Sequence, residues 1–555
     1  MVDNNFFLLM LNRAIWVSYI EQNKIMEAAN YFEMYRTALL NYKAKTEIEK
    51  HDLAQEIIIS QEMFLEKMQK AGDRFFEQKD YPNAVVCYAA YHKYNPKNVQ
   101  VLKNYVVCLE KLEQYDLQIH LLNYVHEISK NDKDILKFLS DAYNNKKDYA
   151  NAIKYYEEYI KCIDNVTNDD YNLLGCYYNL LYSESTQNTQ DALKSLDYFE
   201  KASDNAPNNH LFAKNATIMA GKSNDFERGR KFWNRLLKIN TLTNDDKYDY
   251  AAFCLKNGDF EGWAKYFDAR FDKENNKTAF PKISKPKWNG VKDLSGSTLL
   301  VYYEQGFGDT FLMFGYLPRL TKLAKHVIFV CQNSAYPLLK DNEFGIEVLP
   351  QSTDINKLKF NYYIPSMSVP TILKCSRENI SVGEGYIKAD KKLVTDYKEK
   401  YFNNGNFKIG FSLSGSVTGD KSRNVSIEAL LPFDELDNVE FYCLTKDVKD
   451  EDLSCFKKHK INNIAKHFSD FSYTAAAIEN CDIVVSADNV LLNLSGALGK
   501  KTLGLFNWQN QFRWFDLSGE NVIWLTSVKP FVNDKQNNWS YSIKNAIEEV
   551  KKMLK

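Results

Sequence analysis

The fold of the first half is decided by residues 63–97, which read MFLEKMQKAGDRFFEQKDYPNAVVCYAAYHKYNPK. Gly72 precedes an aromatic pair in a first helical stretch, Asp80 marks a turn, and Ala84 opens a second stretch that Pro96 closes. Small residues allow two antiparallel helices to approach closely, because the distance between helix axes depends on the side chains at the contact. The stretch therefore predicts a helix–turn–helix unit whose aromatic side chains fill the space between the two helices.

The unit recurs along the chain with a period of 34 residues. A polar stretch at 183–189, expected to be a loop, interrupts the register once before the same spacing resumes. A period of this length is typical of solenoids, in which each helix pair buries its inner face by stacking on its neighbours. We therefore expect a repeat array over 63–271, preceded by a helical cap over 1–62. The positions equivalent to Ala84 are Gln118, Ala152, Ser195, Gly229 and Trp263.

A solenoid of this kind presents an extended concave surface, and two interpretations of that surface stay open. It could recognise another polypeptide, either a protein acceptor or a partner. It could equally be a structural spacer or a surface for self-association.

The second half has a different character, with short apolar stretches separated by helical ones. A polar, proline-containing linker is expected over 272–296. Apolar strands that alternate with helices favour parallel sheets covered on both faces. A charged helix near Lys391 and the asparagine-rich stretch 403–406 divide this half into domains at 297–395 and 406–535, followed by a helix over 540–555. The expected strands are 299–303, 327–331, 346–349, 362–365, 408–413, 440–444, 483–486, 502–506 and 522–525.

The first loop expected to carry chemistry is 304–310, which follows a strand and opens a helix. Ligands of open α/β sheets bind at the carboxyl ends of the strands. Gly306 and Gly308 permit a tight turn and a close approach of the backbone to a ligand, and Thr310 lies at the helix start, where free N–H groups attract anions. Asp309 is a candidate general base for an acceptor hydroxyl, although it could simply cap the helix.

Two further loops follow strands of the last domain. The loop 414–423 combines hydroxyls, backbone amides and cations that suit a diphosphate, although it could be an ordinary polar surface loop. At the end of another strand, Asp488 and Asn489 precede a helix of small residues whose N-terminus can hold phosphates without a metal ion; Asp488 could instead be a plain helix cap. The candidate donor-binding residues here are Ser414, Gly415, Ser416, Arg423, Lys446, Asp488, Asn489 and Asn493.

Composition excludes several other classes of protein. The 555 residues carry a formal net charge of −1, which gives no electrostatic reason to expect nucleic-acid binding. No stretch approaches the roughly 20 apolar residues of a membrane span, and no signal segment is evident, so a cytoplasmic location is expected. The ten cysteines form no CxxC and the eight histidines no HExxH, so neither a metal site nor a bound cofactor is expected.

The repeats and loops together are similar to a known architecture. The motifs 304–310, 316–318, 414–415, 486–488 and 494–499, in this order after the repeats, resemble bacterial proteins that join tetratricopeptide repeats to a heptosyltransferase-like domain of the glycosyltransferase family 9 type. The resemblance implies an α-solenoid followed by a GT-B-type pair of Rossmann-like α/β domains, a nucleotide-sugar donor, inversion at the anomeric carbon and no obligatory metal. It also implies that Asp309 is the base and that Asp488 lies near the donor.

Four positions depart from that family pattern. Relatives usually carry Trp at Leu413, Arg at Val425, Thr at Asn489 and His at Asn493. Either the donor differs from the commonest one or activity is reduced. We expect a glycosyltransferase that moves a sugar from a nucleotide-sugar to an acceptor hydroxyl, on a protein bound along the repeat groove. The alternatives are a transferase for a surface glycan of the lipopolysaccharide type and an inactive repeat scaffold.

Overall fold

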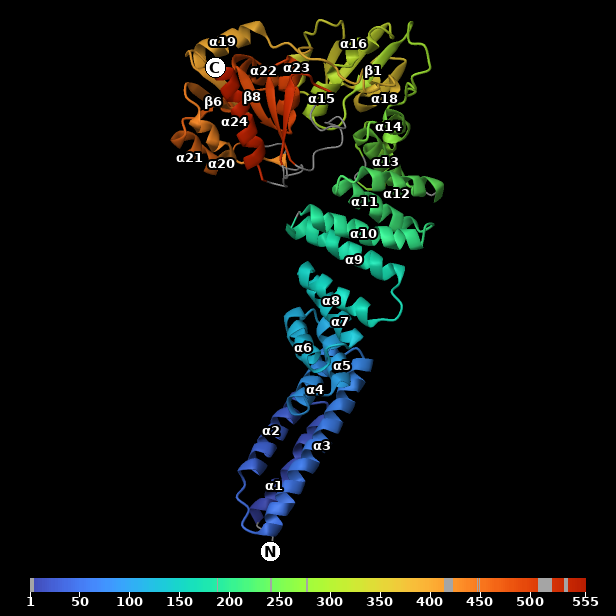
Figure 1. The fold of residues 1–555 in the computed structure, drawn as a ribbon, viewed down its shortest axis with the longest axis vertical. Coiled ribbons are helices and arrows are strands. Elements are labelled where there is room, and N and C mark those ends of the chain that lie inside the picture. Colours follow the sequence, from blue (N-terminus) through green and yellow to red (C-terminus); the bar gives the residue numbers. More distant parts are fainter. Residues whose placement is uncertain are drawn as a thin grey trace. The chain divides into compact units, whose positions relative to one another are not determined.

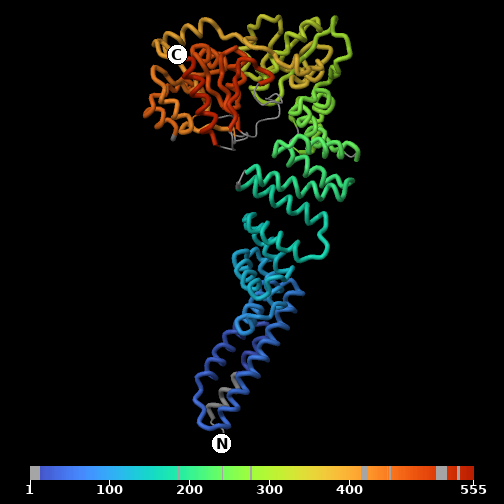
Figure 2. Tube along the Cα trace, in the orientation of Figure 1, coloured from blue at the N-terminus to red at the C-terminus, as the bar shows by residue number. Residues whose placement is uncertain are grey.

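The computed structural model describes residues 4–186, 188–239, 242–275, 278–413, 423–446, 448, 450–507, 522–533 and 538–555. Its contacts divide the chain into two units, Met1–Met219 and Ala220–Lys555. Figure 1 labels the elements of each unit, and Figure 2 follows the backbone through both in sequence colours.

Unit 1 is built of helices in which each packs against the next, as the repeat pattern predicts (Figure 1). Helix α3 runs without a break through the expected boundary between cap and repeats. Helix α11 (His210–Lys222) continues from unit 1 into unit 2. The other helices are α1 (Asn4–Glu21), α2 (Ile25–Asn41), α3 (Glu47–Glu77), α4 (Tyr81–Tyr94), α5 (Val99–Lys111), α6 (Tyr115–Ile128), α7 (Lys133–Asn145), α8 (Tyr149–Cys162), α9 (Asn168–Leu180) and α10 (Thr189–Asn205).

The 34-residue period has a backbone cause at the turns. Lys79, Glu113 and Lys147 adopt left-handed conformations, with φ of 60°, 56° and 62°, and they are 34 residues apart. Asn224 and Gly258 repeat the feature in unit 2, with φ of 56° and 74°. A left-handed residue ends one helix and redirects the chain into the next, so the same turn geometry recurs in these repeats.

The small-residue positions bring paired helices together. A Cβ atom on Gly72 would lie 2.7 Å from the ring of Tyr88, so this glycine is required for the close contact. Where the sequence has a polar residue instead, its side chain bonds to the facing backbone: the Ser195 hydroxyl donates to the Gly175 carbonyl at 2.6 Å. The hydrogen bond satisfies a hydroxyl that is completely buried, which explains why the register tolerates serine here.

The predicted loop at 183–189 is wrong over its first part. A π-helix, η1 (Leu181–Thr186), continues α9 through this region. Tyr182 is buried, and the Tyr149 hydroxyl donates to the Glu184 carboxylate at 2.9 Å, so tertiary contacts hold these polar residues in a helix. The wider π-turn and the added residues shift the repeat register.

Unit 2 begins with further helix pairs, α12 (Phe226–Ile239), α13 (Asn244–Lys256) and α14 (Phe260–Tyr266), and the 3₁₀ helix η2 (Phe267–Phe271). The expected linker then packs onto the first sheet. Trp288 is buried, and its backbone N–H donates to the Tyr363 carbonyl at 2.8 Å.

Two parallel sheets form the rest of unit 2, which confirms the prediction of parallel α/β structure. The first has the order β3-β2-β1-β4, and the second has the order β10-β9-β8-β5-β6-β7. In both, the chain builds outward from one central strand and then returns to build on its other side, as doubly wound sheets do. The strands are β1 (Thr298–Tyr302), β2 (His326–Cys331), β3 (Glu347–Pro350), β4 (Tyr362–Pro365), β5 (Phe407–Ser412), β6 (Val439–Cys443), β7 (Asn462–Asn463), β8 (Ile483–Ala487), β9 (Thr502–Phe506) and β10 (Val528–Val532).

The last predicted strand is in the wrong place. Residues 522–525 are irregular apart from a bridge at Val522, and the strand at the sheet edge is β10. Trp524 and Leu525 are buried in the core without belonging to a strand, so their apolar character was misleading. Pro530 lies inside β10, and an edge strand tolerates the missing N–H of proline.

Helices cover both sheets. Helix α19 (Lys391–Tyr401) packs on α22 (Phe471–Asn480) beside the second sheet, and α24 (Ser540–Leu554) packs on β9 and β10. The other described helices of unit 2 are α15 (Phe307–Phe314), α16 (Leu317–Leu320), α17 (Tyr336–Leu339), α18 (Val369–Ile372), α20 (Ile427–Leu430), α21 (Asp450–Lys458) and α23 (Val490–Leu498), with 3₁₀ turns η3 (Ile355–Lys357), η4 (Ser366–Ser368), η6 (Leu431–Glu435) and η7 (Ala465–His467).

Candidate functional site

The three loops predicted from the sequence follow the strands at which the sheets reverse their order. The glycine loop 303–306 follows β1, which lies between β2 and β4. Leu413 follows β5, and Asp488 follows β8, its neighbour in the second sheet. Such reversals open a crevice at the carboxyl ends of the strands, where ligands of α/β sheets bind. Ser414, Gly415 and Ser416 lie outside the described residues.

The glycine loop is shaped by Gln305, whose φ of 63° is in the left-handed region. Strained backbone of this kind persists where surrounding structure enforces it, often at functional sites. Gly306 is the N-cap of α15, and its N–H donates to Oδ2 of Asp309 at 3.2 Å. Asp309 therefore caps its own helix, and its side chain is buried, with 8% of its surface exposed.

Gly308 and Asn493 are brought together, although as a contact between helices. A Cβ atom on Gly308 would lie 2.7 Å from Nδ2 of Asn493, which in turn donates to the Asn489 carbonyl at 3.1 Å. Helix α15 thereby packs closely against α23 and joins the loop of the first sheet to that of the second. The space next to Gly308 is filled by Asn493, so the close approach expected for a ligand is an approach of one helix to another.

Thr310 has a supporting position in the structure. Its side chain is fully buried, and its hydroxyl donates to Oε1 of Gln332 at 2.8 Å. Because the helix turns this residue toward β2, it anchors the loop from beneath, and the expected contact of its side chain with a donor is not available here.

The cap of α23 is Asn489 rather than Asp488, so the alternative of Asp488 as a plain cap is wrong. Oδ1 of Asn489 accepts from the Leu491 N–H at 2.9 Å, and its Nδ2 donates to the Ser412 hydroxyl at 2.6 Å. Since Ser412 ends β5, this bond ties the ends of β5 and β8 together.

Arg423 and Asp488 lie side by side at this edge. Nη1 of Arg423 is 3.7 Å from Oδ2 of Asp488 and donates to the Asp488 carbonyl at 3.3 Å. The Nε atom of Arg423 is buried and has no hydrogen-bond partner within the described part of the chain. The arrangement joins a guanidinium and a carboxylate at the start of a helix, where an anionic ligand is favoured.

The remaining predicted residues are less directly involved. Lys446 is exposed after the end of β6, the strand next to β5. Leu413 and Val425, two of the positions predicted to depart from the family pattern, are both buried in an apolar core, and the Val425 N–H donates to the Leu413 carbonyl at 2.8 Å. The two positions thus close the base of the loop between them with apolar contacts.

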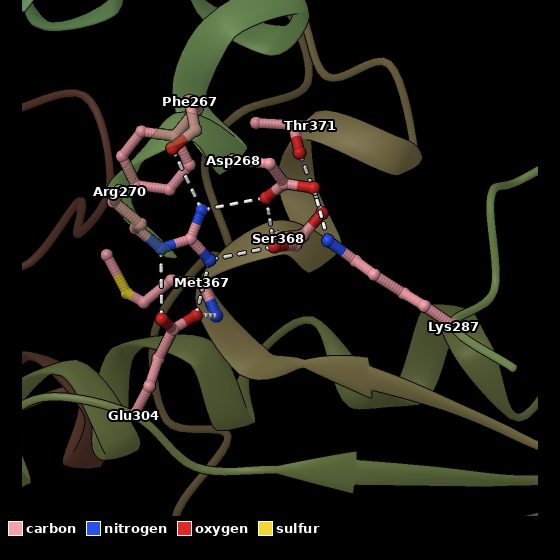
Figure 3. Close-up of polar contacts among 8 residues, drawn as sticks. All are labelled: Phe267, Asp268, Arg270, Lys287, Glu304, Met367, Ser368 and Thr371. Atoms are coloured by element: carbon pink, nitrogen blue, oxygen red, sulfur yellow. Dashed lines mark hydrogen bonds and ion pairs between the residues drawn. The ribbon is translucent and has the colours of Figure 1, made fainter. Parts of the chain in front are cut away.

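A buried ion pair beneath the glycine loop was not predicted (Figure 3). Arg270, from η2, and Glu304, from the loop, are 0% and 1% exposed, and two bonds of 2.6 and 3.0 Å join them. Glu304 also accepts from the Met367 N–H at 2.9 Å. The sequence signal was a glutamate directly after a buried strand, where an ionised side chain requires a partner.

Other polar groups extend this cluster (Figure 3). Arg270 donates to Asp268 at 2.8 Å and to the Ser368 hydroxyl at 2.7 Å, and Lys287 pairs with the same aspartate. Burial raises the pKa of Asp268, but the cations Arg270 and Lys287 outweigh it and hold the pKa below its ordinary value. The last repeat, the linker segment and the end of β4 are thus joined through one charge network.

The described residues form neither a candidate metal site nor a helix that could span a membrane. These residues contain no group of three or more His, Cys, Asp or Glu side chains that could hold a metal ion. None of the helices they form is long and apolar enough to cross a membrane.

Comparisons with known proteins concern the repeats. No protein-family model and no curated protein matches the chain. Among solved structures, MamA is 16% identical, covers 34% of this chain and 95% of its own, with a TM-score of 0.28. PilF of Pseudomonas aeruginosa is 12% identical over 37% of this chain and 90% of its own, with a TM-score of 0.26.

YrrB, described as a TPR protein with an unusual peptide-binding site, is 12% identical over 33% of this chain and 91% of its own, with a TM-score of 0.28. The helix pairs with their recurrent left-handed turns, 34 residues apart, identify the N-terminal region of this chain as an array of tetratricopeptide-type repeats.

Proposed function

We propose that the protein is a metal-independent glycosyltransferase of GT-B type, which moves a sugar from a nucleotide-sugar to a hydroxyl of a protein acceptor. The observation that carries this proposal is the position of the glycine loop and of the Asp488 loop at the order reversals of two parallel sheets. The packing of α15 on α23 supports it further, because the ends of both sheets then contribute to one region.

Asp309, Arg423 and the start of α23 have roles in the proposed reaction. Asp309 accepts the proton of the acceptor hydroxyl as its oxygen attacks the anomeric carbon. The bond from that carbon to the phosphate oxygen breaks, and the nucleoside diphosphate leaves with the electron pair. Arg423 and the N-terminus of α23 stabilise the negative charge that develops on the leaving diphosphate.

The repeat array supports a protein as the acceptor, because stacked helix pairs offer a long surface suited to polypeptides. A second candidate, an inactive scaffold, is favoured by one observation: Leu413 and Val425, two of the positions predicted to depart from the family pattern, are filled by buried apolar side chains.

Donor binding is tested first, by thermal shift of the full chain with UDP-, GDP-, ADP-, CMP- and dTDP-sugars in the presence of EDTA. A ligand at a hundredfold excess over its Kd stabilises the folded state by about 2.7 kcal/mol. One nucleotide class is expected to raise the melting temperature, and Arg423→Met is expected to abolish the shift. If none of the nucleotide-sugars raises the melting temperature, the inactive scaffold is the better interpretation.

Transfer is tested with Asp309→Asn and the same donor. The amide oxygen of Asn can still accept from the Gly306 N–H, so the helix cap and donor binding are expected to persist. Loss of the general base is expected to lower the transfer rate by about 10²–10⁴-fold. Asp341→Asn, at an exposed position, is the matched control. Unchanged transfer by Asp309→Asn would remove Asp309 from the proposed chemistry.

A further inference from the structure

A cavity of about 510 Å³ lies at the carboxyl end of β1. One wall is the segment 278–281, which follows the last repeat, and the other is 302–305, which comprises the end of β1 and most of the glycine loop. The volume is within the range typical of small-ligand pockets.

The lining is aromatic. The ring of Phe280 meets that of Tyr302 edge to face at 5.6 Å, and Tyr302 stacks on Tyr303 at 5.0 Å. Burial raises the pKa of Tyr303 to about 12, so its side chain adds no charge to the cavity. Flat apolar faces with a polar edge suit a ligand of the same character.

The lining of the cavity also carries no unpaired charge. Glu304 is the ionisable carboxylate among its lining residues, and Arg270 neutralises it through two hydrogen bonds. An anionic or cationic ligand would find no free counter-charge in this lining and would lose hydration on entry. The cavity therefore favours an uncharged group.

Its position links the last repeat to the candidate catalytic loop. The Thr278 N–H donates to the Arg270 carbonyl at 3.1 Å, which fixes one wall against η2. Gln305, in the other wall, precedes Gly306, whose N–H bonds Asp309. An occupant of the cavity thus lies beside the loop that carries the proposed base.

We propose that this cavity binds an uncharged aromatic side chain of the acceptor polypeptide and thereby places a nearby hydroxyl at the glycine loop. That the occupant belongs to an acceptor polypeptide rests on the proposed function. That it is an uncharged aromatic side chain rests on the aromatic lining, which offers no free charge.

The test is peptide binding to the full chain without any nucleotide-sugar. The probes are three capped pentapeptides of glycine and serine with one central Phe, Lys or Glu, titrated by calorimetry. The Phe peptide is expected to bind at least tenfold more tightly than the other two. Ala279→Trp, which fills the cavity from an exposed position in its wall, is expected to weaken Phe-peptide binding at least tenfold.

Lys282→Trp is the matched control, since this exposed residue lies just beyond the lining and adds the same ring without entering the cavity. Equal binding of the three peptides, no saturable binding, or an unaltered affinity of Ala279→Trp would overturn the proposal. Binding that Ala279→Trp abolishes, in a protein that binds no nucleotide-sugar, would keep the cavity and reject the transferase. Transfer of sugar to all three peptides, regardless of the central residue, would keep the transferase and reject the cavity as the binding site of an aromatic side chain.

Discussion

At the residue scale, the pair Arg270 and Glu304 shows how a charge buried for structural reasons can resemble a catalytic residue. Arg270 stacks between the rings of Phe267 and Phe271, at 4.2 and 4.1 Å, and its guanidinium binds both carboxylate oxygens of Glu304. Glu304 lies in the motif that predicts chemistry, yet its bonds hold the glycine loop to the last repeat. The role of Glu304 in this motif is therefore structural.

The pair predicts a large loss of stability on removal of one partner. Arg270→Met leaves Glu304 buried without its cation, and breaking a buried pair in this way costs about 3–5 kcal/mol. Equilibrium denaturation of the full chain measures the effect as a change in the free energy of unfolding of unit 2. The double variant Arg270→Met/Glu304→Met is the control, because replacing both partners with apolar groups is expected to recover most of the loss. A single variant as stable as the parent would show that the pair contributes little.

At the scale of elements, the contact of α15 with α23 depends on Gly308. A Cβ atom here would meet Asn493 at 2.7 Å, which forces the helices or the amide to move. Gly308→Ala is expected to cost about 1–3 kcal/mol, as overpacking usually does. Adding Asn493→Ala should restore much of it by removing the amide, and denaturation of the single and double variants measures the coupling. Equal stability of the single variant and the parent would contradict this account.

The end of α13 predicts a dependence of stability on pH. Burial lowers the pKa of Lys256 from 10.5 to about 8, and its ammonium donates to Oδ1 of Asn224 at 2.8 Å and lies over the ring of Phe226. Between pH 8 and 10.5 the unfolded chain binds a proton that the folded chain does not, so the free energy of unfolding rises with pH through this window. At neutral pH the charge opposes folding.

Lys256→Met is therefore expected to stabilise unit 2 at pH 7, by on the order of 1 kcal/mol, and to remove the rise above pH 8. Melting temperatures between pH 7 and 10 measure both effects. Lys282→Met, at an exposed position, should leave the pH profile of the parent unchanged. A profile that is the same for Lys256→Met and the parent would reject the assignment.

Periodic patterns were predictable from the sequence, and features set by tertiary contact were not. The repeat period follows from local turn geometry, and the parallel strands follow from apolar runs that must be buried on both faces. The π-helix at Leu181–Thr186 depends on the distant contact of Tyr149 with Glu184. The prediction of a strand at 522–525 was wrong because a short apolar stretch that is buried in irregular structure has the same sequence pattern as a buried strand.

The candidate site was predictable to the level of its loops. Strand ends identified the regions of Asp309 and Asp488, because a loop after a central strand is recognisable along the chain. The role of each residue within a loop was not predictable. The capping by Asn489, the burial of Thr310 and the use of Gly308 for helix packing all depend on which face of the helix meets another element.

At the scale of the whole molecule, two contact units predict two steps of unfolding. Repeat arrays are stabilised by contacts between neighbouring repeats, whereas in unit 2 one core joins both sheets to α13, α14 and η2, and a second core lies in the second sheet. Chains with several folding units commonly depart from two-state behaviour. Calorimetry of the full chain is expected to show two transitions.

A nucleotide-sugar that binds unit 2 then stabilises one transition and leaves the other in place, because a ligand stabilises the structure that binds it. At a hundredfold excess over Kd the gain is about 2.7 kcal/mol in that transition. Calorimetry with and without the donor measures the temperature of each transition. The Arg270→Met variant identifies the transition of unit 2, because this substitution is expected to lower its temperature. A single transition that the donor raises as a whole would mean that the two units unfold as one, and the repeats would then have to be treated as part of the same cooperative structure as the candidate site.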